Sequence, residues 1–275
     1  MMTRRLVVGC EFTFEAAVPT LAVFQVQPDD SPLHTKRSEF WVTTPTLALR
    51  SYRDLYDNPC ARVVLPAGWS SLRYEATIDV VDRVEDADET AREMPADELP
   101  DEVLVYTLPS RYCLPDVLAD EAWDLFNAVP PGYGRVQAIC DHVHEHLTFQ
   151  YGSTSALSTA SDVNTSRLGV CRDFTHLAIS FCRAFNIPAR YVFGYLPAMD
   201  VDVPATDEPM DFAAWMEVWL EGRWWTFDPR NNVRRKGRTV IGRGRDASDV
   251  AMATTFGGPR LNQMTVIANE VAPTD

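Results

Sequence analysis

The chain has 275 residues, 46% of them hydrophobic, which is enough to bury a sizeable core in one large or two modest domains. Its formal charge is −14, and basic residues cluster only at residues 234–238, so the composition disfavours nucleic-acid binding. No stretch approaches the roughly twenty apolar residues of a membrane span, and no secretion signal is evident. The six cysteines are scattered as in a reduced protein, and we expect a cytoplasmic location with no membrane partner.

Residues 1–82 are predicted to form a small β-domain. Hydrophobic and polar side chains alternate at residues 6–15 and again at residues 72–80. This period of two is typical of half-buried antiparallel strands. Proline, glycine and asparagine turns separate the segments, as in a domain built from short strands.

Residues 83–115 are predicted to form an acidic linker. Between Asp79 and Glu102 there are eleven acidic residues against only Arg83 and Arg92. Such a run of like charges repels itself and is usually solvated. We therefore expect it to separate the β-domain from a second domain at residues 116–275.

The second domain is predicted to begin with helices and to continue with antiparallel strands, which makes an α+β fold. Apolar residues at helical spacing and alternating strand patterns define the segments. The helices are expected at residues 117–128, 136–147 and 171–185, and the strands at residues 190–195, 212–220, 223–228, 239–241 and 264–267.

A hairpin is predicted around Glu221-Gly222, because two such residues between strands suit a tight turn. Leu220 then pairs with Arg223, and this register sets Trp215 opposite Asp228. Ala213, Trp215 and Asp228 therefore share one face of the sheet.

Cys171 opens the third predicted helix. In the first helical turn, unpaired backbone N–H groups and the helix dipole stabilise a thiolate, so we expect a modestly lowered thiol pKa. This is how a nucleophilic cysteine is usually built. The alternative is that Cys171 is a small buried hydrophobic residue, which is the commoner role of a lone cysteine.

Four ordered segments resemble the transglutaminase-like superfamily of papain-like cysteine enzymes, in its bacterial type with an N-terminal β-domain. They are Gly-Val-Cys-Arg-Asp-Phe at 169–174, Ile-Pro-Ala-Arg-Tyr-Val at 187–192, Ala-Trp-Met-Glu-Val at 214–218 and Trp-Thr-Phe-Asp-Pro at 225–229. The resemblance implies a papain-like core in which the nucleophile helix packs on an antiparallel sheet. It also implies that Cys171 attacks a peptide or protein amide to form a thioester, while Asp228 orients a catalytic histidine. No cofactor is expected.

The expected histidine does not match. In the family it immediately precedes the Ala-Trp pair, where this chain has Ala213, and all five histidines come earlier. His176 lies about 140° around the helix from Cys171 and cannot act as its base. Three explanations stay open: a substitution made to trap a complex, a lineage with another proton-transfer group, or a catalytically dead binding protein.

Other candidate residues surround this incomplete triad. Trp215 is a candidate wall of the cleft, and Tyr151 and Asn164, in the approach to Cys171, are candidate substrate-binding residues. His142, His144 and His146 do not have the His-Glu-x-x-His spacing, so we expect no metal.

Two functions follow as hypotheses. The first is a transglutaminase-like cysteine acyltransferase or amide hydrolase that acts through a Cys171 thioester, with activity reduced because Ala213 replaces the base. The alternative is a catalytically inactive or base-substituted module that binds a peptide or a small amide.

Overall fold

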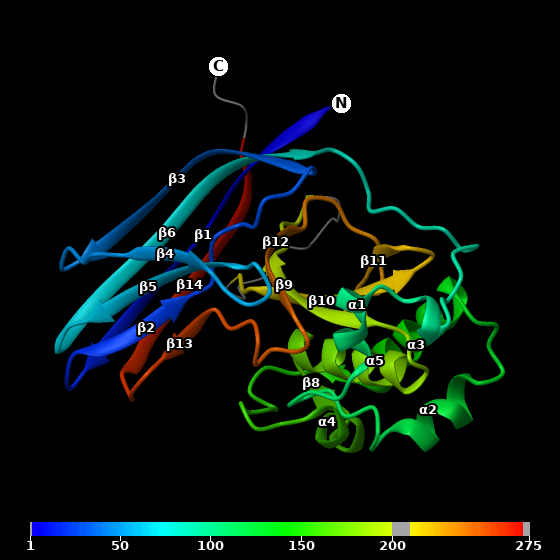
Figure 1. Ribbon diagram of the computed structural model, residues 1–275. Coiled ribbons are helices and arrows are strands. Elements are labelled where there is room, and N and C mark those ends of the chain that lie inside the picture. The colour runs from blue at the N-terminus through cyan, green and yellow to red at the C-terminus, as the bar shows by residue number, and fades with distance from the viewer. Residues whose placement is uncertain (1, 200–209, 272–275) are drawn as a thin grey trace.

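The structure, a computed structural model, describes residues 2–199 and 210–271. Two antiparallel sheets pack face to face on one side of the molecule, and a third sheet with helices beneath it forms the other side (Figure 1). This is the α+β architecture that the sequence predicted, with a papain-like core. Within the described ranges, no helix is both long enough and apolar enough to cross a bilayer.

The paired sheets bury the alternating side chains of the N-terminal strands. The first sheet has the order β14 (Arg260–Val271), β1 (Thr3–Ala16), β6 (Gly68–Val81) and β3 (His34–Thr44). The second has the order β13 (Ala253–Thr255), β2 (Thr20–Phe24), β5 (Pro59–Leu65) and β4 (Arg50–Arg53). Phe12 and Phe24 meet between the two sheets with ring centroids 5.3 Å apart, so the predicted alternation marks a shared core.

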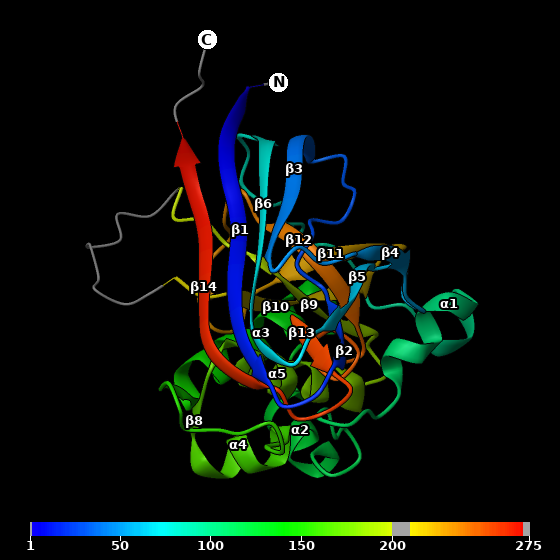
Figure 2. The same cartoon turned by 90° about the vertical axis from the view of Figure 1, so that its left-hand side faces the viewer.

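The C-terminal strands belong to these sheets rather than to the third one. β14 pairs with β1 along most of its length, and β13 pairs with β2 (Figure 2). The domain boundary predicted at residue 116 assigned both strands to the second domain. A strand pattern in the sequence does not show which strand it pairs with. Residues from the two ends of the chain therefore complete one β-sandwich.

The third sheet carries the segments that resemble the cysteine enzymes. Its order is β11 (Arg223–Phe227), β10 (Ala213–Leu220), β9 (Ala189–Tyr195) and β12 (Thr239–Gly244). Helix α5 (Cys171–Ala184) packs on one face, where Phe174, Leu177 and Phe181 share a core with Tyr191 and Met216. The remaining elements precede α5 in the chain: η1 (Ala96–Glu98), α1 (Asp101–Leu104), η2 (Val105–Thr107), α2 (Ala119–Phe126), α3 (Tyr133–His146), β7 (Thr148–Phe149), α4 (Ala160–Ser166) and β8 (Leu168–Gly169). Among them, η2, α2, α3, α4 and β8 contact α5.

The predicted hairpin register is confirmed. Leu220 pairs with Arg223 and Met216 pairs with Phe227. Glu221 and Gly222 both adopt positive φ, 48° and 81°, which a tight two-residue hairpin turn requires. The ladder ends at Phe227, so Asp228 lies one step beyond the last paired residue.

The acidic segment packs against the rest of the molecule, which differs from the solvated linker expected from its charge. Ala91, Leu99 and Val103 are buried. Glu93 forms an ion pair with Arg135 at 3.0 Å, and other acidic residues of the run find arginine partners. Charge composition alone misses this because each buried carboxylate is neutralised by a residue far away in the sequence.

Candidate functional site

The start of α5 is held by the residues around Cys171. The Asp173 carboxylate accepts hydrogen bonds from the Val170 backbone N–H at 2.9 Å and from the Thr154 hydroxyl at 2.6 Å. A Cβ at Gly169 would lie only 2.8 Å from the Asp173 Cβ, so this approach requires glycine. These contacts fix the first turn and with it the position of the Cys171 thiol.

The thiol lies against the edge of β10. Its Sγ is 3.9 Å from the Phe212 carbonyl oxygen, and the Ala214 backbone N–H is directed at the sulfur. The backbone N–H of Trp219 donates to the carbonyl of Pro188, next to β9. The backbone N–H and C=O groups of the odd-numbered residues of β10 therefore point toward β9, and those of the even-numbered residues point toward β11. Because β11 pairs only as far as Met216, Cys171 occupies the edge that a longer β11 would cover.

Burial raises the pKa of the Cys171 thiol to about 11, although Arg230, the Ala214 N–H and the Arg172 N–H act in the opposite direction. The expectation of a lowered pKa from the helix start is therefore wrong. The helix N-terminus does favour the thiolate, but the loss of water around the sulfur costs more. This balance favours the protonated thiol at neutral pH.

Ala213 lies on the face of the sheet away from α5. It packs with Val192 and Trp215, whereas Ala214 and Met216 face the helix. The predicted common face of Ala213 and Trp215 is therefore present. A side chain longer than alanine at this position would have to turn around the open edge of β10 to meet the thiol.

Asp228 has its hydrogen-bonding capacity filled. One carboxylate oxygen accepts from the backbone N–H groups of Arg230 at 3.1 Å and Asn231 at 2.9 Å. The other accepts from the Asn231 side-chain amide at 2.8 Å and from Arg238 at 2.7 Å. Burial raises the pKa of this carboxyl, but Arg238 and Asn231 outweigh it, so the pKa is lowered and Asp228 is ionised. Its four acceptor positions hold the turn that follows β11.

The three candidate binding residues lie in different places. Trp215 is 1% exposed on the face away from α5, beneath the Arg238 guanidinium at 4.9 Å. Asn164, in α4, links this helix to α2 and α3. Its side-chain amide donates to Glu121 at 2.6 Å, and its backbone carbonyl accepts from His146. Among the described residues, no side-chain hydrogen bond joins either of them to Cys171.

Tyr151 follows a segment that runs beside the loop before Cys171. Gln150 N donates to Gly169 O at 2.9 Å, which places this segment beside the loop that leads into Cys171. The half-exposed Tyr151 ring contacts Phe149 at 4.9 Å, and the Arg230 guanidinium lies 3.9 Å from the Phe149 ring centroid. Sequence reasoning missed the roles of Phe149 and Arg230, since no motif signals a cation–π contact across eighty residues.

The histidines serve the fold. His144 donates to the Arg230 carbonyl at 2.8 Å, and His176 accepts from the Ala247 N–H at 3.1 Å. The His176 ring stacks between Tyr112 and Tyr191, and burial lowers its pKa to about 3. In the part of the chain that the structure describes, no three His, Cys, Asp or Glu side chains gather closely enough to hold a metal ion.

A cysteine that opens a helix packed on an antiparallel sheet defines the core of the papain-like cysteine enzymes. Residues 124–229 match the family described as the transglutaminase-like superfamily. The match spans residues 124–229, which hold helix α5 and the hairpin of β10 and β11.

Two uncharacterised mycobacterial proteins are similar to this chain. One, from Mycobacterium leprae, is 41% identical over 107 residues, which cover 38% of this chain and 38% of that protein. The other, from Mycobacterium tuberculosis, is 36% identical over 125 residues, which cover 41% of this chain and 38% of that protein. The chain thus spans about two fifths of the length of the curated relatives it matches.

A crystal structure from Cytophaga hutchinsonii, described as a candidate cysteine protease, matches the whole molecule. Its TM-score is 0.87 at 29% identity, and the match covers 100% of this chain and 93% of that chain. The likeness therefore includes the β-sandwich as well as the core.

Proposed function

We propose that this chain is a transglutaminase-like module that binds a peptide or a small amide beside Cys171 and cleaves it slowly or not at all. One observation carries this proposal: the Cys171 thiol, with its pKa near 11, faces the backbone of β10, and position 213, where the resemblance implies a histidine, is an alanine. A thiol without a base is a weak nucleophile, and a leaving amine then lacks a proton donor.

The surroundings of the thiol support the binding part of the proposal. Cys171 is only partly buried, and β11 ends before it. Tyr151 offers an exposed aromatic ring next to the loop before Cys171, and Arg230 offers a cation. An extended peptide uses main-chain hydrogen bonds at a strand edge and side-chain contacts beside it.

The second candidate is a cysteine acyltransferase or amide hydrolase with another proton-transfer group. Arg230 and the Ala214 N–H both favour the thiolate, which suits a nucleophile. In that reaction the proton leaves Sγ for a nearby carboxylate, the Cys171 sulfur bonds to the carbonyl carbon, the C–N bond breaks, and the carboxyl group returns the proton to the leaving amine. Asp211 is the candidate proton carrier, because it precedes Phe212 and partial removal from water raises the pKa of its carboxyl, against the effect of Arg230.

Iodoacetamide labelling followed by intact mass tests both candidates. The other five cysteines are buried, and Cys171→Ala gives the background. We expect slow labelling at neutral pH and a rise of about tenfold per pH unit toward a plateau near 11, as for a thiol without a base. Fast labelling at neutral pH, with ammonia release from glutaminyl peptides that is lost in Cys171→Ala and in Asp211→Asn, would favour the enzyme.

The binding part needs its own measurement. A glutaminyl peptide amide titrated calorimetrically into the chain should show saturable binding, and Tyr151→Ala should weaken it by about tenfold, as expected for loss of one aromatic contact. Leu157→Ala, at another exposed position, is the matched control. Absence of saturable binding would overturn the module proposal.

A further inference from the structure

Arg230 is a cation near the thiol whose charge no neighbouring carboxylate neutralises. Its guanidinium lies against the Phe149 ring, and within residues 2–199 and 210–271 it forms no ion pair and donates no hydrogen bond. The residue is partly exposed, so a ligand can reach it. An arginine in this state can bind a carboxylate through two parallel N–H groups.

The position of Arg230 is fixed before any ligand arrives. Its backbone N–H donates to Asp228 at 3.1 Å, and its carbonyl accepts from His144 at 2.8 Å. The guanidinium carbon lies 3.9 Å from the centroid of the Phe149 ring, which orients the guanidinium plane. Little rotamer freedom is therefore left to lose when an anion binds.

Phe149 places this guanidinium at the approach to Cys171. Phe149 pairs with Gly169 in the short parallel ladder of β7 and β8, and Cys171 follows Gly169 by two residues. Two residues of extended chain span about 7 Å. Burial raises the pKa of the Cys171 thiol, and Arg230 is the strongest influence in the opposite direction, which agrees with a cation at such a range.

The other charged groups at this approach differ from Arg230. Arg172 is engaged, because it donates to Asp173 at 2.8 Å and to the carbonyl of Ser155 at 2.9 Å. Partial removal from water raises the pKa of the Asp211 carboxyl against the effect of Arg230, but among the described residues no ion pair joins the two. A ligand can therefore bind Arg230 without breaking an existing ion pair.

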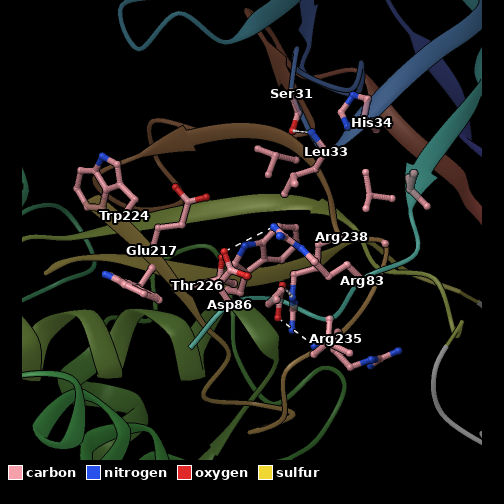
Figure 3. A pocket seen from close by; sticks show the side chains of 18 of the residues that line it. Ser31, Leu33, His34, Arg83, Asp86, Glu217, Trp224, Thr226, Arg235 and Arg238 are labelled. Atoms are coloured by element: carbon pink, nitrogen blue, oxygen red, sulfur yellow. Dashed lines mark hydrogen bonds and ion pairs between the residues drawn. The ribbon is translucent and has the colours of Figure 1, made fainter. Parts of the chain in front are cut away.

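The arginines on the face of the third sheet away from α5 are already paired. Figure 3 shows the cavity there, which Arg83 and Arg238 help to line. Arg238 forms an ion pair with Asp228 at 2.7 Å, and Arg83 pairs with Asp86 at 3.5 Å. An anion in that cavity would have to compete with these carboxylates, which an anion at Arg230 does not.

We propose that Arg230 binds a carboxylate of the ligand, one or two residues away from the amide that lies at Cys171. The spacing follows from the path through Phe149 and Gly169, since each residue of extended chain spans about 3.3 Å. The ligand class is then a peptide or small amide with a free carboxylate close to that amide, at its C-terminus or on an acidic side chain. This inference rests on the proposed binding of an amide at Cys171 and names the feature by which the site selects it.

Calorimetric titration of the full chain with matched peptides tests the preference. The peptides are acetyl-Gln-Gly with a free carboxylate, its C-terminal amide, acetyl-Gln-Asp amide, and acetyl-Gln-Gly extended by prolines to a carboxylate about 12 Å further on. We expect the free acid to bind at least tenfold more tightly than its amide, as for gain of one charged hydrogen bond. The proline-extended acid should bind like the amide, because its carboxylate lies out of reach. Tight binding of acetyl-Gln-Asp amide would add acidic side chains as a source of the carboxylate, and weak binding would restrict it to the C-terminus.

Variants of Arg230 locate the contact. Arg230→Gln should bring the affinity for the free acid down to that for the amide and leave the amide unchanged, because the backbone bonds to Asp228 and His144 remain. Arg230→Met, which keeps a long apolar stem on Phe149, should do the same. Arg230→Lys keeps the charge and should retain part of the preference. Arg62→Gln, the same charge change at an exposed position of β5, is the control and should leave the preference intact.

The outcomes separate this inference from the proposed function. Equal affinity for the free acid and the amide, with saturable binding of both, would overturn the role of Arg230 and leave the binding module standing. A preference for the acid that persists in Arg230→Gln and Arg230→Met, with melting temperatures near that of the parent chain, would overturn it as well. If none of the peptides binds saturably, the proposed function fails and this inference fails with it.

Discussion

Replacing Ala213 with histidine tests whether only a proton acceptor is missing beside the thiol. Ala213 is 8% exposed and shares its face with Val192 and Trp215. The new ring must therefore turn around the edge of β10, where Cys171 Sγ already lies 3.9 Å from the carbonyl of the preceding residue. If the imidazole reaches the thiol, the proton moves from Sγ to the ring nitrogen and an ion pair forms.

The size of the effect follows from the raised pKa. An opposite charge within 4–6 Å lowers a pKa by about 1–3 units, so the Cys171 value would fall from about 11 to about 8–10. The thiolate fraction at neutral pH would then rise by about tenfold to a thousandfold. The initial rate of iodoacetamide labelling at pH 7, measured by intact mass, should rise in proportion, less a modest factor for weaker nucleophilicity.

Ala213→Gln is the matched control, since glutamine adds a polar side chain of similar length that cannot take up a proton. Melting temperatures of both variants show whether position 213 tolerates the added volume. Equal labelling rates in Ala213→His and Ala213→Gln, with both proteins folded, would refute the reasoning. In that case the face away from α5 would keep the ring from the sulfur.

Two further predictions concern stability. Because the pKa of His176 falls from 6.5 to about 3 on folding, the unfolded chain binds a proton in this window that the folded chain does not. The free energy of unfolding is therefore highest above about pH 6.5 and falls as the pH drops toward 3, with a loss of about 2 kcal/mol at pH 5. Urea unfolding of His176→Phe should show a smaller loss of stability over the same pH range. Gly169→Ala should destabilise the protein by about 1–3 kcal/mol, because its Cβ would press on Asp173, whereas Gly134→Ala, with open space around its Cβ in α3, should be neutral or stabilising in the same urea titrations.

Local chemistry made parts of the fold predictable. The Glu221-Gly222 turn and the period of two gave the hairpin register, because the turn fixes which residues face each other. The apolar stripe from Val170 gave α5 and placed Cys171 at its first residue. These features depend on residues close together in the sequence.

Other features of the fold and the site depend on contacts between segments that are far apart in the chain, and a sequence pattern does not predict such contacts. The pKa of Cys171 is set by its burial against β10, forty residues later. Asp228 was expected to orient a histidine, but its partner is Arg238, which no motif marks. β14 pairs with β1 across the whole chain, and a strand pattern does not name its partner.

The state of Asp228 and the absence of the histidine are physically connected. A buried carboxylate stays ionised only if donors satisfy its oxygens, so without an imidazole it needs other partners. The Asn231 and Arg238 side chains donate to one of its oxygens and two backbone N–H groups donate to the other, which leaves no lone pair for an imidazole N–H. Asn231→Ala removes one of these donors and keeps the Arg238 ion pair. In the Ala213→His background it should therefore raise ammonia release from glutaminyl peptides, while Ala213→His alone gains mainly in labelling. If Asn231→Ala adds nothing to a double variant that is folded, the carboxylate and the ring do not meet, and Asp228 serves only the turn after β11.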